Sequence, residues 1–350
     1  MQYSTTRLTI AIFLFVTLAI ATYSDDYDTK HMTTRDGTNY SYDYVPAKGR
    51  KPTVLFLHGY PGTRHNWHGQ MIDLSAAGYG VISPDCLGYG DSDILVDIGS
   101  YNFKHLTEHI TEILDKEGVH TVVGVGHDWG SGILSRLAVW HPTRLEKLVF
   151  LSVGYSAPGL FFDLDAINSM GLQQYGYMQF GFWYFFNSYD AAQLVAANLE
   201  SFFHLVFPTD ISAWAKNLAQ LGAARAWLSS NTTTSLPRYV DEDFKRIWLA
   251  SFSREGAVQA SMNYYKSAMR GLQEADEEAL TGSNRTLHVP VLAIGGAKDL
   301  VGRADQIRKQ TEPWAAKGYT ERTLETGHWI MHEDRQGLSS ILLEFLIQSG

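Results

Sequence analysis

Short apolar runs alternate with amphipathic stretches in two parts of the chain, and the spacing predicts strands that alternate with helices. An alternating segment at 32–45 predicts an edge hairpin. Strands are predicted from the apolar runs at 53–57, 81–84, 121–125, 148–151, 290–294 and 320–324. Helices are predicted from the periodic stretches at 65–77, 103–117, 130–140, 304–310 and 336–347. This order indicates an α/β fold with a mostly parallel sheet and helices on both faces.

The alternation stops between residues 155 and 277. This segment is rich in aromatic residues, is helical in its periods and contains no convincing buried strand. A helical segment between two halves of one sheet is typical of a cap, because ligands of open parallel sheets bind beyond the carboxyl ends of the strands. We therefore expect a core at 30–154 and 278–350 and an inserted helical cap at 155–277.

Residues 1–24 have the layout of a secretory signal peptide or an ER membrane anchor. Arg7 precedes an apolar stretch at 8–21, which ends in Ala-Ile-Ala and runs into polar residues. The stretch is shorter than the roughly 20 residues of a membrane span, which favours cleavage over membrane association. We expect the body in the secretory pathway, either secreted, in the ER lumen or anchored at the ER membrane; a cytosolic chain is the alternative. Sequons at Asn39, Asn231 and Asn284 are candidate glycosylation sites in that compartment.

Charge and cysteine usage restrict the possible partners. The formal net charge is −9 and there is no run of Lys or Arg, which argues against nucleic acid and anionic membrane surfaces. Cys86 is the single cysteine, so an intramolecular disulfide is excluded, and small semi-buried packing explains it better than a nucleophile. The His65/His68 and His328/His332/Glu333 spacings match no recognised ligand set. We expect a neutral small molecule and neither a metal nor a cofactor.

The predicted strand at 121–125 runs into Gly126-His127-Asp128-Trp129-Gly130. A glycine two residues to either side of Asp128 permits a sharp strand-to-helix turn that presents the central side chain. A carboxyl group with a reference pKa of about 3.9 is ionised at neutral pH and can displace a leaving group at saturated carbon. Asp128 is therefore a candidate nucleophile for epoxides or alkyl halides, and a helix N-cap is its structural alternative.

Two further candidates follow predicted strands. Asp299 comes just after the strand at 290–294 and His328 just after the strand at 320–324. A parallel sheet brings both to the same edge as Asp128, in the chain order nucleophile, acid, histidine. Taken alone, Asp299 could be an ordinary loop aspartate and His328 a surface histidine. The positions of all three residues together favour one site.

With His58-Gly59-Tyr60-Pro61 and the turn at 85–92, these motifs resemble the epoxide hydrolase group of the α/β-hydrolases over nearly all the chain after residue 30. In that fold the elbow normally carries serine. The resemblance implies an oxyanion hole made by the backbone N–H groups of Tyr60 and Trp129. It also implies that Asp128 attacks an epoxide, that His328, oriented by Asp299, activates water to hydrolyse the ester, and that a vicinal diol leaves.

Members of this group resemble one another in two cap tyrosines that hydrogen-bond the emerging alkoxide. Tyr265 matches the later one, whereas Phe182 stands where the earlier one is expected. Tyr184 and Tyr177, with Tyr175, are nearby candidates for the missing role. The resemblance thus implies Tyr265 as the ring-opening acid, alone or with one of these neighbours, and packing within an aromatic cap is the alternative.

Other reactions remain open. A haloalkane dehalogenase would use the same aspartate but usually has asparagine at the position of Tyr60, and a fluoroacetate-type enzyme would need arginines just after Asp128. An epoxide-opening cyclase or isomerase of secondary metabolism would use a substrate hydroxyl in place of water. A binding protein on a retired scaffold is disfavoured because Asp128, Asp299 and His328 are all present. Aromatic residues at 161–207 suggest a bulky apolar or natural-product epoxide, although they would equally build the cap's own core.

Overall fold

The computed structural model describes residues 27–159, 163–278, 280 and 282–348, and centres on an eight-stranded sheet. The strand order is β1-β2-β4-β3-β5-β6-β7-β8. β2 is antiparallel to β1 and β4, and the remaining neighbours are parallel, as predicted. The strands are β1 (Thr29–Thr33), β2 (Asn39–Val45), β3 (Thr53–Leu57), β4 (Gly80–Pro84), β5 (Val122–His127), β6 (Leu145–Leu151), β7 (Val291–Gly296) and β8 (Tyr319–Leu324).

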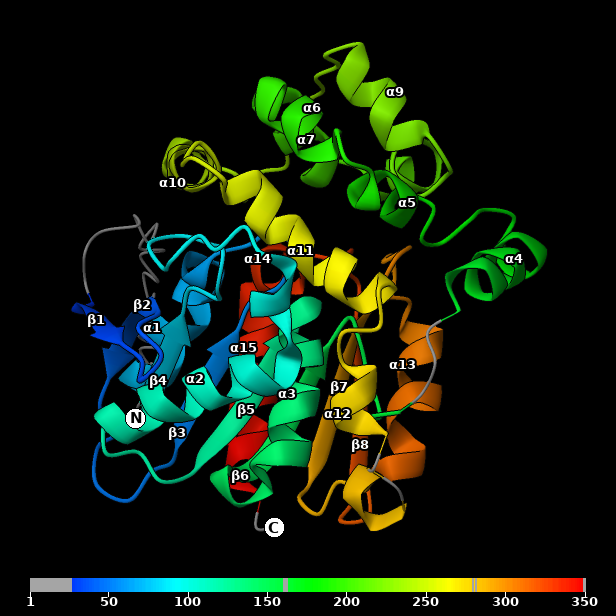
Figure 1. Ribbon diagram of the computed structural model, residues 1–350. Coiled ribbons are helices and arrows are strands. Elements are labelled where there is room, and N and C mark those ends of the chain that lie inside the picture. Colours follow the sequence, from blue (N-terminus) through cyan, green and yellow to red (C-terminus); the bar gives the residue numbers. More distant parts are fainter. Residues whose placement is uncertain (1–26, 160–162, 279, 281, 349–350) are drawn as a thin grey trace, which may run out of the picture.

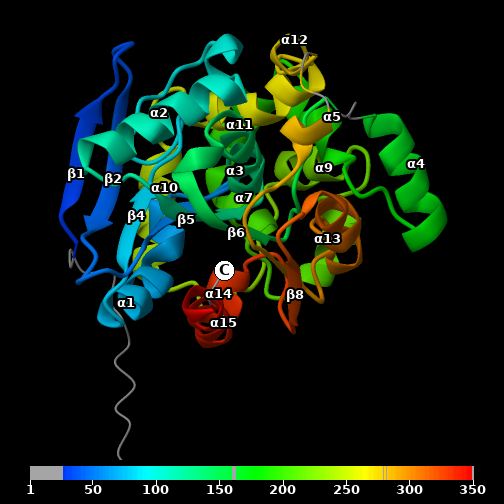
Figure 2. The ribbon, with the colours of Figure 1, turned by 90° about the horizontal axis from the view of Figure 1, so that it is seen from below.

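Helices cover both faces of this sheet. Figure 2 shows α1 (His68–Ala76) and α15 (Arg335–Ile347) on one face and α2 (Phe103–Lys116) and α3 (Trp129–Trp140) on the other. α13 (Ala304–Thr311) packs against β7, and the short α14 (Ile330–Glu333) precedes α15. Every residue of β3, β4, β5 and β7 is buried, which explains their continuous apolar sequences.

Between β6 and β7 the described part of the chain forms helices and loops only. Figure 1 shows most of these helices above the carboxyl ends of the strands, with α11 lying across the core. We call this segment the cap; its domain limits at 155 and 277 remain a prediction. Its helices are α4 (Leu164–Tyr175), α5 (Phe182–Asn187), α6 (Ala191–Ala197), α7 (Leu199–Val206), α8 (Trp214–Asn217), α9 (Ala223–Ser229), α10 (Glu242–Phe252), α11 (Ala257–Met269) and α12 (Glu274–Glu277).

Two elements differ from the sequence prediction. β6 begins at Leu145, three residues earlier than expected, because Glu146 and Lys147 interrupt the apolar run. Lys147 can nevertheless be buried, since its Nζ donates to the carbonyl oxygens of Phe345 at 2.7 Å and Gln348 at 2.6 Å. The helix predicted at 65–77 is divided into a 3-10 helix, Arg64–Trp67, and α1.

The N-terminal predictions fall on a part of the chain that is not described. Residues 1–24, with the predicted signal peptide or anchor, lie outside the described residues. In the ranges that the structure does describe, no helix has both the length and the apolar character required to cross a membrane. The sequon asparagines Asn39, Asn231 and Asn284 are all exposed.

Candidate active site

Asp128 occupies a sharp turn between β5 and α3. Its backbone has φ 52° and ψ −122°, a conformation that non-glycine residues rarely adopt and that costs about 1–3 kcal/mol. A Cβ on Gly130 would collide with the backbone of Leu57, and one on Gly126 would lie 2.6 Å from the Gly130 carbonyl oxygen. The two glycines are therefore sterically required. The Asp128 side chain makes no N-cap hydrogen bond, so the helix-cap explanation is wrong.

The carboxylate of Asp128 faces two backbone donors. The N–H of Tyr60 donates to Asp128 Oδ1 at 2.8 Å, and the N–H of Trp129 also hydrogen-bonds the carboxylate. Burial raises the pKa of Asp128, while the charge of His328 and these two N–H groups act in the opposite direction. The donors implied as an oxyanion hole thus lie against the carboxyl group on which the oxyanion would form.

The His58-Gly59-Tyr60-Pro61 turn is held by its own residues. His58 Nε2 accepts from the N–H of Cys86 at 2.9 Å, and His58 Nδ1 lies 3.0 Å from the Gly59 carbonyl oxygen. Burial lowers the pKa of His58, so the ring is neutral and can accept at Nε2. Gly59 has no space for a side chain, because a Cβ would collide with Asp128. The carbonyl of Pro61 accepts from the indole of Trp248 at 2.8 Å, which ties the turn to the cap.

His328 and Asp299 form a buried pair. His328 Nδ1 lies 2.8 Å from Asp299 Oδ2, and Asp299 Oδ1 accepts from the N–H groups of Val301 and Gly302, each at 2.9 Å. Burial opposes the charge of both groups. The charge of His328 and these hydrogen bonds nevertheless lower the pKa of Asp299, and the charges of Asp299 and Asp128 raise the pKa of His328. An ionised Asp299 fixes Nδ1 as the donor and leaves Nε2 for water.

Two residues that sequence reasoning did not assign support His328. His127 Nε2 lies 2.9 Å from the His328 carbonyl oxygen, and burial lowers the pKa of His127 well below its usual value, so the neutral ring donates there. Glu333 accepts from the N–H groups of Gly327 at 2.7 Å and Trp329 at 3.2 Å. Because His127 directly precedes Asp128 in the sequence, a role for it in the site could have been predicted. The sequence pattern around Glu333 suggested only a possible metal ligand.

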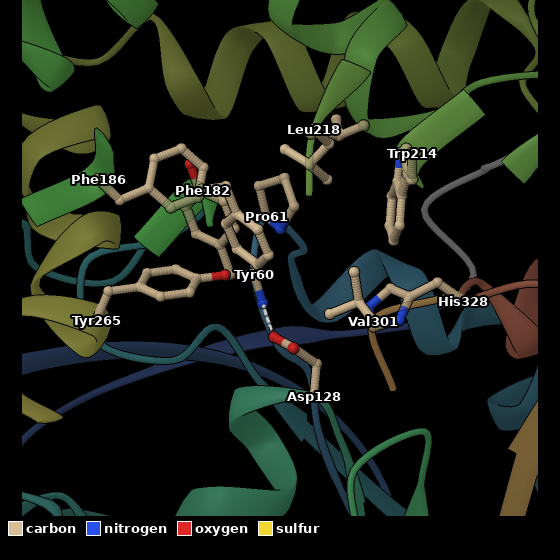
Figure 3. A pocket seen from close by; sticks show the side chains of 11 residues that line it. Tyr60, Pro61, Asp128, Phe182, Phe186, Trp214, Leu218, Tyr265, Val301 and His328 are labelled. Atoms are coloured by element: carbon tan, nitrogen blue, oxygen red, sulfur yellow. Dashed lines mark hydrogen bonds between the residues drawn. The ribbon is translucent and has the colours of Figure 1, made fainter. Parts of the chain in front are cut away.

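A small cavity of about 30 Å³ lies over Asp128, between core and cap. Figure 3 shows Asp128 between Tyr265 on one side and His328 with Trp214 on the other. Apart from this carboxylate, the imidazole, the indole and two phenols, the lining is apolar. The lining residues are Tyr60, Pro61, Asp128, Val301 and His328 from the core and Phe182, Phe186, Val206, Trp214, Leu218 and Tyr265 from the cap.

Tyr265 is a buried residue of α11 whose ring is surrounded by aromatic rings. The ring centroids of Tyr60 and Trp129 each lie 5.0 Å from that of Tyr265. Burial and the charge of Asp128 raise the pKa of Tyr265 well above its usual value, so the phenol stays protonated. Its oxygen hydrogen-bonds the Trp129 side chain. Because indole only donates, the phenol hydrogen remains available to a ligand.

The other cap candidates separate into two groups. Phe182 lines the cavity, with its ring centroid 5.9 Å from that of Tyr265. Tyr184 donates to Asp165, and Tyr177 donates to the Leu300 carbonyl oxygen at 2.8 Å; neither lines the cavity. Of the two alternatives, the geometry favours Tyr265 without these neighbours, because their hydroxyl groups are bound elsewhere. Tyr175 likewise donates to Asp305 at 3.1 Å.

Cys86 is a packing residue. It is buried, its Sγ lies 3.7 Å from the His58 carbonyl oxygen, and burial raises the pKa of its thiol. A thiol with a raised pKa is a poor nucleophile at neutral pH. The structure thus supports the packing role that the sequence favoured.

A family model described as the alpha/beta hydrolase fold matches residues 52–335. The chain belongs to the α/β-hydrolase family. Within it, this α/β-hydrolase is 27% identical over 315 residues to an epoxide hydrolase from Caballeronia sordidicola, covering 87% of this chain and 90% of that protein. It is 25% identical over 328 residues to bifunctional epoxide hydrolase 2 of Sus scrofa, covering 90% of this chain but 56% of that longer protein.

Solved structures show the same fold. Epoxide hydrolase A from Mycobacterium thermoresistibile superposes with a TM-score of 0.75 at 24% identity, over 91% of this chain and 98% of that one. An epoxide hydrolase from Vigna radiata gives a TM-score of 0.70 at 24% identity, over 91% and 97% of the two chains. The predicted α/β-hydrolase fold is confirmed.

Proposed function

We propose that this α/β-hydrolase converts epoxides to vicinal diols through an ester on Asp128. The observation that carries the proposal is the position of the Asp128 carboxylate, held by the Tyr60 N–H at 2.8 Å at the base of a cavity that Tyr265 and His328 also line. The similarity to proteins named epoxide hydrolases supports the same reaction.

In the first half-reaction, an oxygen of Asp128 attacks an epoxide carbon and the C–O bond of the ring breaks. Tyr265 donates its phenol hydrogen to the oxygen that leaves. The charge of Asp128 is one cause of the raised pKa of Tyr265. Ester formation removes that charge, so the phenol becomes a better acid as the alkoxide develops. Attack and proton donation are coupled through this electrostatic interaction.

In the second half-reaction, water attacks the carboxyl carbon of Asp128. His328 accepts the water proton at Nε2, and Asp299, 2.8 Å from Nδ1, stabilises the resulting imidazolium. The negative charge develops on the carboxyl oxygen that faces the N–H groups of Tyr60 and Trp129. The ester bond then breaks, and the His328 imidazolium gives its proton to the departing alkoxide, so that the diol leaves. The second proton of the water passes from the Asp128 carboxyl group to the Tyr265 phenolate.

The cavity favours an apolar epoxide. The six cap residues that line it are aromatic or aliphatic. None of its lining residues is Lys or Arg, so a substrate carboxylate would have no cationic partner there. We infer an apolar, aryl or polyene epoxide; a natural-product substrate, and capture by an internal hydroxyl in place of water, remain the finer alternatives.

A single-turnover experiment in heavy-oxygen water tests the chemistry. With enzyme in excess over styrene oxide, the first diol should carry unlabelled oxygen from Asp128, and the peptide that contains Asp128 should gain the label. D97N, which changes an exposed aspartate, is the matched control for D128N: D97N should label normally and D128N should not. Label found directly in the first diol would mean attack by water and would overturn the proposal. Halide release from alkyl halides without diol formation would favour a dehalogenase.

We also propose that the body enters the secretory pathway, on the basis of residues 1–24 and the three exposed sequons. Expression of the full chain in eukaryotic cells, with N-terminal sequencing and glycosidase treatment, tests this. A mature terminus near residue 22–24 and a glycosidase-sensitive mass support a cleaved signal. An intact N-terminus on an unmodified cytosolic protein would refute the proposal.

A further inference from the structure

A second cluster of ionisable side chains lies where the β1–β2 hairpin meets α2. Asp36 Oδ2 lies 2.9 Å from His105 Nε2 and 3.0 Å from His109 Nε2. The two histidines are four residues apart on α2, so their rings share one face of the helix, with centroids 4.3 Å apart. We propose that Asp36, His105 and His109 form a site for a divalent transition-metal ion, with Zn²⁺ as the preferred ion.

The three ligand atoms have suitable identity and spacing. One nitrogen of each imidazole and one carboxylate oxygen lie within 4.8 Å of one another. Ligands bound at 2.0–2.2 Å in tetrahedral geometry are roughly 3.3 Å apart, so small side-chain rotations would suffice. Two imidazoles and one carboxylate suit Zn²⁺ and its neighbours better than Mg²⁺ or Ca²⁺, which prefer all-oxygen sites.

Neighbouring residues already orient these groups. Asp36 Oδ1 accepts from the Thr34 hydroxyl and, at 3.1 Å, from the Thr38 N–H, so Oδ2 remains to face the two imidazoles. His109 Nδ1 lies 3.0 Å from the hydroxyl of Tyr40. That hydroxyl can donate to Nδ1 when Nε2 carries the proton, and can accept from Nδ1 when Nε2 binds a metal. Such outer partners commonly fix metal-ligating histidines.

The charges around the cluster favour a cation. Glu108 adds negative charge, with Oε2 3.4 Å from His105 Nδ1. The Asp36 and His105 side chains are 40% and 39% exposed, so an ion and its waters can enter.

The site is separate from the catalytic centre. β1 is the edge strand and lies four strand positions from β5, which carries Asp128; at about 4.8 Å per strand the separation is roughly 19 Å. Figure 2 shows the hairpin and α2 together at one side of the molecule. A bound ion would join the hairpin to α2. Because the ion would bind only the native state, it would stabilise the fold.

Calorimetric titration of the tag-free, chelator-treated full chain with Zn²⁺ tests the proposal. H105Q is the first variant, because His105 is half exposed and its replacement should not disturb folding; H288Q, at another exposed histidine, is the control. We expect one Zn²⁺ per chain and a dissociation constant raised at least ten-fold by H105Q and D36N but not by H288Q. Zn²⁺ should raise the Tm of the parent and H288Q proteins and not that of H105Q.

Spectroscopy and competition complete the test. Co²⁺ bound to the parent should show the visible bands of a nitrogen- and oxygen-ligated ion, and these bands should be lost in H105Q. Excess Mg²⁺ should not displace Zn²⁺. Zn²⁺ binding that is equal in H105Q and H288Q would place the ion elsewhere. Absence of binding by the parent would show that the three residues form a hydrogen-bonded cluster only, and either result overturns the proposal.

Discussion

Replacing Tyr265 by phenylalanine should slow ring opening and leave ester hydrolysis unchanged. The substitution removes one oxygen from a residue that lines the cavity with Asp128, and Phe182 already occupies a neighbouring wall position. Tyr177 and Tyr184 cannot replace the lost donor, because their hydroxyl groups bind Leu300 and Asp165. Loss of one preorganised donor to a developing oxyanion costs about 2.7–4 kcal/mol. Because Tyr265 is the phenol assigned to the alkoxide, we expect alkylation to slow by roughly 100- to 1,000-fold.

Stopped-flow tryptophan fluorescence can separate the two steps. The ring of Trp129 is 5.0 Å from that of Tyr265, and the Trp129 backbone N–H donates to the Asp128 carboxylate, so the emission of Trp129 should respond to alkylation. Single turnovers of H328Q and Y265F/H328Q isolate the alkylation rate. Y177F is the matched control, since it removes a hydroxyl outside the cavity, and it should stay within about three-fold of the parent.

An unchanged alkylation rate in Y265F, with a folded protein by thermal melting, would refute the reasoning. It would mean that the alkoxide is protonated by water or by another group, and that Tyr265 serves the cap by packing. A slower ester hydrolysis with normal alkylation would equally contradict the assignment, because the phenol is not required in the second half-reaction.

Further predictions concern the same site. F182Y should add a second donor and raise the alkylation rate, by up to about 100-fold if its hydroxyl reaches the alkoxide, as single-turnover rates would show. H328Q should accumulate the Asp128 ester, visible as substrate mass on the intact protein, whereas the exposed control H288Q should not. Because Asp299 raises the pKa of His328 and keeps its charge in the ester, ester hydrolysis should increase with pH as the imidazole loses its proton, and a rate independent of pH would contradict this. For Asp128 the folded pKa is raised, so its stabilising contribution is present below pH 3.8 and lost as pH rises through the folded pKa. D128N, which is never charged, should therefore have a higher Tm at pH 7, and an equal or lower Tm would count against burial as the dominant effect.

Much of the fold follows from local sequence, because the buried parallel strands are apolar on both faces. β3 was predicted with its observed limits, since Thr53–Leu57 is a single apolar run. The start of β6 was not predicted, because burial of Lys147 depends on carbonyl groups that α15 and the residue after it supply from about 200 residues further along the chain. The charge of Lys147 does not indicate from the sequence that these carbonyl acceptors exist.

The same distinction applies to the site. Asp128, Asp299 and His328 were predicted together because parallel strands place their carboxyl ends at one edge. The cap side of the cavity was predicted only at Phe182 and Tyr265. Residues such as Trp214 and Leu218 reach the cavity through helix packing, and an aromatic-rich sequence does not distinguish lining residues from those of the cap's own core. Asp36 and His109 are 73 residues apart in the sequence. Only the i, i+4 spacing of His105 and His109 could have indicated that these residues form a cluster.

In the proposed mechanism, the elbow at Asp128 links the two half-reactions through one set of donors. In the free enzyme, the Tyr60 and Trp129 N–H groups counteract the effect of burial and help to keep Asp128 ionised for attack. When water attacks the ester, the same carboxyl carbon becomes tetrahedral, and its negative oxygen would lie against donors that need not move. A serine at this position would place only its hydroxyl near the donors, and the oxyanion would form on the substrate. The aspartate therefore changes both the nucleophile and the molecule on which the oxyanion forms. The rate of ester hydrolysis should consequently depend more on the geometry of the Tyr60 turn than on the shape of the substrate.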